Sequence, residues 1–338
     1  MLTIDGSYGE GGGQILRSSL ALSIVTGTPF RIDNIRARRR KPGLMRQHLT
    51  AVRAAAEIGQ ADVAGDEIGS TQLAFAPGQT VGGDYVFRIG TAGSTTLVLQ
   101  TILLPLVLAQ EPSRIVLEGG THNPFAPPFD FLQRAYIPFL NRMGPSIQAT
   151  LERPGFYPAG GGRIVVTITP AKSLHGITVL ERGKMRRRLG RAIISSLPRQ
   201  VAEREVRVIA KRLGWDDGET EIVEIEHPVG PGNIVTLELE HENVTEVFTG
   251  FGEVGRAAEA VATHAVQQCQ RYLKSDAPIG PYLTDQLMLP LAVAKSGAFR
   301  SAGLSRHAET HLKLINTFLD VRIDTKRNAK GEVRVAID

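Results

Sequence analysis

The chain has 338 residues, of which 42% are hydrophobic and 22% are charged, and its net charge is +5. This composition is typical of a folded globular protein with room for two or more cores, and it excludes a chain that is mostly disordered. The single cysteine, Cys269, excludes an internal disulfide framework and fits a reducing compartment, so we expect a cytoplasmic protein.

We expect neither a secretory signal nor a membrane span. The stretch "MLTIDGSYGEGGG" (1–13) lacks a basic leader followed by an apolar segment. The longest apolar stretch, 97–109, is interrupted by Gln100 and Pro105, and it is shorter than the roughly 20 residues that a bilayer requires. It is typical of a buried helix instead.

Three segments share one pattern, which is an apolar helical run of about four turns, a short break and a strand-like start that contains Arg. They are residues 13–32, 94–116 and 284–303. A second helical run follows each of them, at 42–59, 127–144 and 307–321. Strand-like runs such as 162–170 and 331–338 close the units. The sequence therefore predicts a unit of two helices on a small sheet, repeated three times.

Local signals suggest where some of these helices begin and end. In the run 42–59, Pro42 suits an opening turn and Gly59 suits a stop. Ser94 is a candidate N-cap for the helix that follows it.

The third unit is interrupted. The first two units are separated by about 80 residues and the second and third by about 190. Residues 181–276 carry their own helix signal at 199–214 and strand signals at 233–252. We therefore expect an α/β (α+β) fold in which 1–180 and 277–338 form the repeated-unit catalytic domain and 181–276 an inserted α/β domain.

The glycine-rich stretch "GSYGEGGGQILR" (6–17) opens a helix, where free backbone N–H groups and the positive helix end can hold phosphate. Glu10, Gln14 and Arg17 could supply a metal carboxylate, a polar contact and a phosphate contact. The alternative is a tight turn with a solvated Glu and Arg.

A basic segment follows. Residues 31–46 hold seven Arg or Lys against one acid, Asp33, which favours a phosphate or polyanion ligand over the alternative of a solvated basic face. Gln47 and His48 lie beside the apolar face of the next helix and could line a cleft, although a surface histidine fits the pattern equally well. Gln100 is a polar intrusion in a very apolar helix, so it should be hydrogen-bonded if buried.

"HAETHLKL" (307–314) places His307 and His311 four residues apart. It does not match the HExxH zinc motif, because Ala308 follows the first His. A metal-binding pair, two surface histidines and a single catalytic histidine all stay open on the local sequence.

Five stretches together resemble the RNA 3'-terminal phosphate cyclase family over nearly the whole chain. They are "DGSYGEGGGQILRSSLALS" (5–23), "IRARRRKPGLMRQHLTAV" (35–52), "GPGN" (230–233), "YLTDQLMLPLA" (282–292) and the late "HxxxHL" (307–312). The resemblance implies a triplicated unit like the C-terminal domain of translation initiation factor three, with a smaller inserted domain. It also implies an ATP-dependent enzyme that converts an RNA 3'-terminal phosphate to a 2',3'-cyclic phosphodiester by ligase-type nucleotidyl transfer, through a covalent histidine-AMP intermediate, and releases AMP and pyrophosphate.

The resemblance also implies a set of site residues. His311 corresponds to the nucleophile, with Arg17, Arg39 and His48 as further catalytic residues, while His307 has no assigned role. The resemblance assigns Glu10 to Mg²⁺ or Mn²⁺, and Gln14, Arg36 and Gln47 to substrate phosphate. ATP would contact Gln100, Pro127, Phe251, Tyr282, Asp285 and Gln286. Tyr282 and Pro127 would sandwich adenine, and Phe251 would close that side.

The implied partner is an RNA with a 3'-phosphate end, with no membrane and no obligate protein partner. A non-catalytic RNA-binding relative and an enolpyruvyl transferase of similar repeated architecture are the rival hypotheses. The presence of His311 with Glu10 and the arginines favours catalysis. The basic run 182–191 could contact RNA phosphates or form a solvated strand edge.

Overall fold

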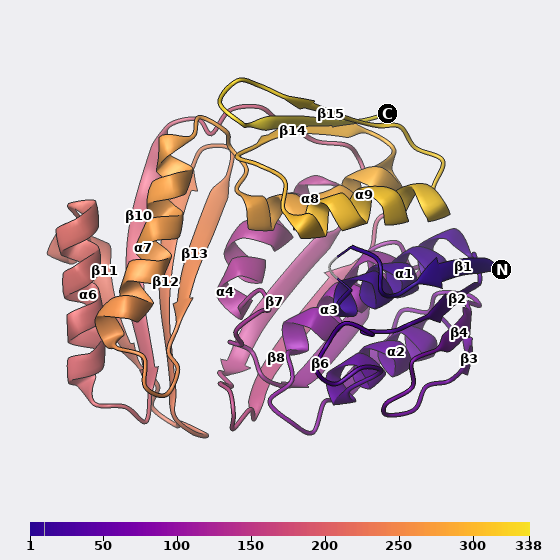
Figure 1. Cartoon of the computed structure of the whole chain (residues 1–338), viewed down its shortest axis with the longest axis horizontal. Coiled ribbons are helices and arrows are strands. Elements are labelled where there is room, and N and C mark those ends of the chain that lie inside the picture. The colour runs from indigo at the N-terminus through magenta and orange to yellow at the C-terminus, as the bar shows by residue number, and fades with distance from the viewer. Residues whose placement is uncertain (10) are drawn as a thin grey trace.

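The computed structural model describes residues 1–9 and 11–338, which form four four-stranded sheets with helices packed on them (Figure 1). The first unit contains β1 (Leu2–Asp5), α1 (Gly13–Thr26), β2 (Phe30–Asp33), α2 (Arg46–Ile58), β3 (Asp62–Ala64) and β4 (Leu73–Ala76). The second contains β5 (Asp84–Arg88), α3 (Thr95–Leu106), β6 (Ser113–Gly119), α4 (Phe129–Phe131), a π-helical turn η1 (Leu132–Tyr136), α5 (Ile137–Arg142), β7 (Ser146–Arg153) and β8 (Gly162–Thr169). The third contains β9 (Thr178–Val179), α8 (Pro281–Ala294), β14 (Gly297–Ser301), α9 (Arg306–Phe318), β15 (Ile323–Arg327) and β16 (Val333–Ile337).

These three sheets have the same topology. Their strand orders are β1-β2-β4-β3, β5-β6-β8-β7 and β9-β14-β16-β15, so in each the first strand neighbours the second, the second the fourth, and the fourth the third. In each sheet the first pair is parallel and the other two are antiparallel. The predicted fold class, with a repeated two-helix unit on a small sheet, is therefore confirmed.

A fourth sheet comes between β9 and β14 in the chain. It is built from β10 (Met185–Ser195), α6 (Arg199–Leu213), a 3₁₀ turn η2 (Asp217–Glu219), β11 (Thr220–Glu224), β12 (Gly232–His241), β13 (Thr245–Phe251) and α7 (Ala258–Lys274), with the strand order β11-β10-β12-β13. Figure 1 shows it at one end of the molecule, and β13 contacts α4 and η1 of the second unit. The division of the chain at residues 181 and 276 stays a proposal.

The basic run 182–191 lies partly on β10, and several of its charges are compensated within this sheet. Arg188 forms a bidentate pair with Glu219 at 2.6 and 2.8 Å, and Arg187 contacts Glu238 at 2.7 Å. Arg191 also contacts Glu238, at 3.4 Å. These pairs give no support to the idea that the run extends an RNA-binding surface.

The helices of the three units meet at the centre of the molecule. One hydrophobic core runs through all three units from Ile4 to Ile337, and α1 packs against both α3 and α9. Gly27 ends α1 in the left-handed conformation (φ 66°). Because glycine has no Cβ, this conformation causes little steric strain. The N-terminal parts of α1, α2, α3, α8 and α9 carry many of the predicted site residues, and the others lie in loops and on β13.

Three boundary predictions can be compared with the structure. Gly59 is the C-cap of α2, as predicted. The Ser94 side chain caps α3 by accepting from the Leu97 N–H at 3.3 Å, as predicted. The prediction that Pro42 opens α2 is wrong, because α2 begins at Arg46. Gly43 has a φ of 76°, outside the helical region, and its N–H donates to the Ile35 carbonyl at 2.9 Å. Residues 42–43 therefore belong to the loop that precedes α2.

The second helical run of the second unit is also irregular, since the π-helical turn of residues 132–136 separates α4 from α5. Pro138, in the first turn of α5, has no N–H and cannot continue the ordinary hydrogen-bond ladder into the preceding turn.

Among the helices that the structure describes, none has the length and apolar character needed to cross a bilayer.

Candidate active site

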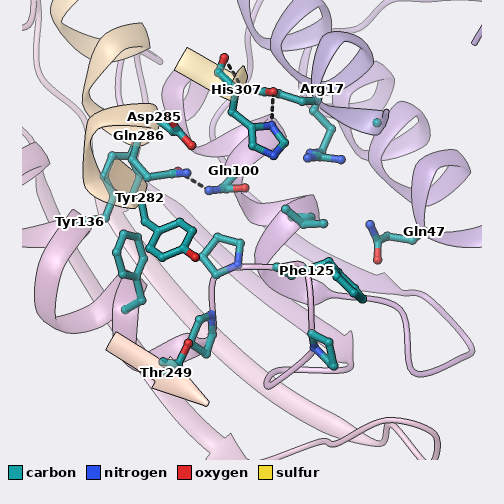
Figure 2. A pocket seen from close by; sticks show the side chains of 18 of the residues that line it. Arg17, Gln47, Gln100, Phe125, Tyr136, Thr249, Tyr282, Asp285, Gln286 and His307 are labelled. Atoms are coloured by element: carbon teal, nitrogen blue, oxygen red, sulfur yellow. Dashed lines mark hydrogen bonds between the residues drawn. The ribbon is translucent and has the colours of Figure 1, made fainter. Parts of the chain in front are cut away.

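A cavity of about 770 Å³ opens where the helices of the three units meet β13 and α7 (Figure 2). This volume falls within the range of about 300–1,000 Å³ that is usual for small-molecule sites. Each predicted site residue other than Glu10 lines it: Gln14, Arg17, Arg36, Arg39, Gln47, His48, Gln100, Pro127, Phe251, Tyr282, Asp285, Gln286 and His311. Residues up to 297 positions apart in sequence are thus neighbours here, although their individual roles stay predictions.

His311 is held on three sides in the second turn of α9. Its Nδ1 lies 3.1 Å from the Asp285 backbone oxygen, and a carbonyl can only accept, so Nδ1 carries the proton. In the neutral ring Nε2 is then unprotonated. The Gln14 amide nitrogen and the Ser18 hydroxyl each lie 2.8 Å from that Nε2. The ring therefore presents the Nε2 lone pair toward α1.

Burial keeps His311 neutral. Desolvation lowers its pKa to about 3, and the backbone oxygen of Asp285 opposes this shift only in part. His307 and Arg17 lower the pKa further because they disfavour a second positive charge. At neutral pH essentially every molecule has an unprotonated Nε2, which is the form of imidazole that can attack an electrophile.

Gln14 bridges the two histidines of α9. Its Oε1 is hydrogen-bonded to Nδ1 of His307, and its Nε2 lies 3.3 Å from the His307 carbonyl oxygen as well as 2.8 Å from His311 Nε2. Since Oε1 can only accept, the proton of His307 is on Nδ1. His307, to which the sequence assigned no role, therefore lines the cavity and orients the amide that contacts His311.

Asp285 connects α8 to the start of α9. Its Oδ1 accepts from the hydroxyl of Ser305 at 2.6 Å, and the same hydroxyl caps α9 by accepting from the Ala308 N–H at 3.1 Å. Burial raises the pKa of the Asp285 carboxyl to about 7. This side chain thus fixes the helix that carries His311, while its backbone oxygen fixes the ring.

The glycine-rich loop packs directly against α9 and His48. A Cβ on Gly9 would lie 2.2 Å from the Thr310 hydroxyl, next to His311. A Cβ on Gly13 would lie 2.6 Å from His48 Nε2 and 2.7 Å from a guanidinium nitrogen of Arg17. Glycine at these positions lets the loop, His48 and Arg17 share one small volume.

His48 is a neutral donor. Its Nδ1 accepts from the Met45 N–H at 3.3 Å, so the ring proton is on Nε2. Burial, Arg17 and Arg36 together lower the pKa of His48 to about 3. Three arginines, Arg17, Arg36 and Arg39, line this side of the cavity, and burial beside Arg39 also lowers the pKa of Arg36. Such a cluster of cations and N–H donors suits phosphate oxygens.

Two glutamines join elements of different units. The Oε1 of Gln47, on α2, accepts from the Ser94 N–H at 2.6 Å, at the start of α3. Gln100, on α3, donates its amide to Gln286 on α8, as the dashed line in Figure 2 shows. Gln100 is half-buried, and it is hydrogen-bonded, as the sequence led us to expect of a buried glutamine at this position.

Glu10, the predicted metal ligand, lies outside the described residues. Within residues 1–9 and 11–338 no cluster of three or more His, Cys, Asp or Glu side chains could hold a metal ion. The alternative in which His307 and His311 form a metal-binding pair gains no support, since both rings are hydrogen-bonded to Gln14.

Several lining residues escaped the sequence analysis. Ser18 follows Gln14 by four residues and so lies on the same face of α1, and that spacing was an available signal. Four others come from β13, α7 and the connection between them, namely Thr249, Arg256, His264 and Gln268. Nothing local marks those four, because they reach the cavity only through the docking of the fourth sheet. Phe125 is a further lining residue from the loop after β6.

Comparison with known proteins gives one consistent result. The family model described as RNA 3'-terminal phosphate cyclase matches residues 8–325. An RNA 3'-terminal phosphate cyclase of Ralstonia nicotianae is 51% identical over 98% of this chain and 95% of its own, and one of Koribacter versatilis is 49% identical over 96% and 91%. One of Salmonella typhimurium is 48% identical over 98% and 97%. Among solved structures, the enolpyruvyl transferase NikO from Streptomyces tendae aligns with 99% of this chain and 47% of its own at 11% identity and a TM-score of 0.38, and no argument rests on it. The chain belongs to the RNA 3'-terminal phosphate cyclase family.

Proposed function

We propose that this protein uses ATP to convert an RNA 3'-terminal phosphate to a 2',3'-cyclic phosphodiester through a covalent His311-AMP intermediate. The observation that carries the proposal is the unprotonated Nε2 of His311, which Gln14 and Ser18 orient in the wall of a cavity that Arg17, Arg36 and Arg39 also line. A neutral nucleophile beside a cluster of cations is what attack on a triphosphate requires. Family membership supports the same reaction class.

In the first step, the hydrogen bonds from Gln14 and Ser18 to Nε2 of His311 break, and the Nε2 lone pair attacks the α-phosphorus of ATP. A P–N bond forms, the bond between that phosphorus and the bridging oxygen of pyrophosphate breaks, and pyrophosphate leaves with the electron pair. The ring then carries a positive charge, which the hydrogen bond from Nδ1 to the Asp285 carbonyl stabilises. The guanidinium groups and the Nε2–H of His48 offset the negative charge that builds up on the leaving group.

In the second step, an oxygen of the RNA 3'-phosphate attacks the same phosphorus. The P–N bond breaks, the ring returns to its neutral form, and the RNA end is activated as an anhydride with AMP. The vicinal 2'-hydroxyl then attacks the 3'-phosphorus, its proton goes to solvent, and AMP leaves with the electron pair. Dividing the condensation in this way replaces one difficult displacement by three easier ones.

The other predicted contacts place ATP at the α3–α8 side of the cavity. Tyr282 and Pro127 are proposed to enclose the adenine, and Phe251, on β13, to close that side. The half-exposed Tyr282 lies on the Gln286 side in Figure 2, where the hydrogen-bonded Gln100 and Gln286 offer further polar contacts. Gln14, Arg36 and Gln47 are proposed to contact substrate phosphate on the α1–α2 side.

We also propose Glu10 as a ligand of Mg²⁺ or Mn²⁺, on the family resemblance alone. A hard divalent cation takes oxygen ligands and would neutralise charge on the triphosphate. The described residues do not form a metal site by themselves, so no step above depends on the cation.

The test is incubation with ATP labelled on the α-phosphate, a divalent cation and an RNA that ends in a 3'-phosphate. We expect an acid-labile, alkali-stable label on the protein and a cyclic RNA end. His311→Ala should abolish both. His307→Ala should slow labelling without abolishing it, because His307 only orients Gln14. Labelling and cyclisation that persist in His311→Ala would contradict the proposal.

A further inference from the structure

One aromatic ring in the cavity is unexplained by the chemistry above. Phe125 lies in the loop between β6 and α4, and its side chain is fully exposed (102%). Its backbone has a φ of 63°, a region that a bulky residue without a glycine's freedom rarely adopts. The ring contributes nothing to a hydrophobic core, so folding alone does not account for a phenylalanine there.

The loop that carries the ring is anchored on both sides of its tip. On one side of the tip, the Asn123 side chain donates to the Ala92 carbonyl at 2.5 Å. His122, before the tip, and Asp130, after it, form a partly buried pair at 2.8 Å, and the Phe129 N–H donates to the Thr121 carbonyl at 3.1 Å. These bonds restrain the loop, so little conformational entropy would be lost when a ligand contacts the exposed ring.

The position of the ring separates it from the proposed adenine site. Phe125 lines the same cavity as His311, but Figure 2 shows it on the side of Gln47, whereas Tyr282 lies on the side of Tyr136 and Gln286. His48, next to Gln47 on α2, feels the charge of Arg36, and Arg36 in turn feels the charge of Arg39, so both arginines lie near the Gln47 side of the cavity. An aromatic face near cations suits a nucleotide whose phosphate contacts the arginines and whose base stacks on the ring.

We propose that the nucleobase of the 3'-terminal nucleotide of the RNA stacks on Phe125. The cavity would then hold one aromatic ring for each substrate, Tyr282 for the adenine of ATP and Phe125 for the RNA base. This inference rests on the proposed function, since it assigns the second substrate of the same site. Every base has an aromatic face, so such a platform binds RNA ends without selecting their sequence. The 3'-phosphate of the RNA then lies near Arg36 and Arg39, where it would receive the adenylyl group.

The experiment compares steady-state cyclisation of a 3'-phosphorylated oligonucleotide by three variants. Phe125→Ala should raise the KM for RNA roughly 5- to 100-fold, the range expected for the loss of one stacked base. Phe125→Tyr should stay within about threefold of the parent, because it keeps the aromatic face. Ile68→Ala is the matched control, since Ile68 is also an exposed apolar residue (59%) but does not line the cavity, and it should have no effect.

A second substrate isolates the base. With an oligonucleotide whose last nucleotide lacks its base, Phe125→Ala and the parent should have the same KM, because nothing is left to stack. An oligonucleotide that lacks an internal base far from the 3' end should restore the difference. If Phe125→Ala lowers the affinity equally for the abasic end, the ring does not bind the terminal base and the inference is wrong.

Labelling by ATP in the absence of RNA separates this inference from the proposed function. All variants should label His311 at the parental rate. A parent protein that takes no label would overturn the proposed function itself. A labelled, cyclising parent whose KM for RNA is unchanged by Phe125→Ala would overturn only the role of Phe125, and slower labelling in Phe125→Ala would assign the ring to ATP instead.

Discussion

The neutral state of His311 has a measurable consequence for stability. Its pKa is about 3 in the folded protein, while an unperturbed histidine has a pKa of about 6.5. The pKa is lowered on folding, so the unfolded chain binds a proton that the folded chain does not. The stability that His311 contributes is therefore fully present above about pH 6.5, and it is lost as the pH falls toward 3.

The magnitude follows from the two pKa values. Between pH 7 and pH 5, protonation of this one residue in the unfolded chain lowers the free energy of unfolding by about 2 kcal/mol. His311→Asn removes the titrating ring and keeps a polar group in its place. We therefore expect the parent to lose about 2 kcal/mol more than His311→Asn over this pH interval.

Denaturant unfolding of both proteins at pH 7 and pH 5 measures this difference. His48, whose pKa is also lowered to about 3, is present in both proteins, so its contribution cancels. The same pH loss in the parent and in His311→Asn would refute the argument that burial keeps His311 unprotonated. It would also remove the physical basis for attack by His311 without a separate base.

Three further predictions use other contacts of the structure. Gly13→Ala should raise the KM for ATP roughly 10-fold or more, because the new Cβ would displace His48 and Arg17. Gly218→Ala is the control and should leave labelling kinetics unchanged, because a Cβ at that position meets nothing within 4 Å. Gln14→Ala should slow labelling of His311 by ATP roughly 10- to 100-fold, since it removes both the contact to Nε2 and the bridge to His307; an unchanged single-turnover rate would mean that the amide has no part in the reaction. Burial raises the pKa of Glu205 to about 7, so the stability that its neutral form preserves is present below about pH 4.5 and is lost as the pH rises through 7. Glu205→Gln should therefore gain roughly 2 kcal/mol relative to the parent between pH 5 and pH 8, and parallel pH profiles of the two unfolding free energies would contradict this.

Local sequence was sufficient for the repeated elements. The apolar runs that became α1, α3 and α8 are long and periodic, so tertiary contacts only reinforce a helix that the pattern already favours. Boundaries set by neighbouring loops were not predictable in this way. Pro42 looks like a helix start, yet Gly43 is tied to Ile35, and α2 begins only at Arg46.

The chemistry of the site depends on tertiary contacts rather than on local sequence patterns. The sequence by itself marks the glycine-rich loop and the arginines as unusual and leaves the roles of His307 and His311 open, and only the family resemblance assigns His311 and the other residues to one reaction. Whether His311 is a nucleophile or a surface residue depends on its burial, on the Asp285 carbonyl at Nδ1 and on the donors from α1 at Nε2. Those contacts join residues nearly 300 positions apart, and no local pattern encodes a proton's position on a ring. The tertiary structure alone decides it, because the packing of α1, α8 and α9 removes water from His311 and leaves only these partners to fix its tautomer and its pKa.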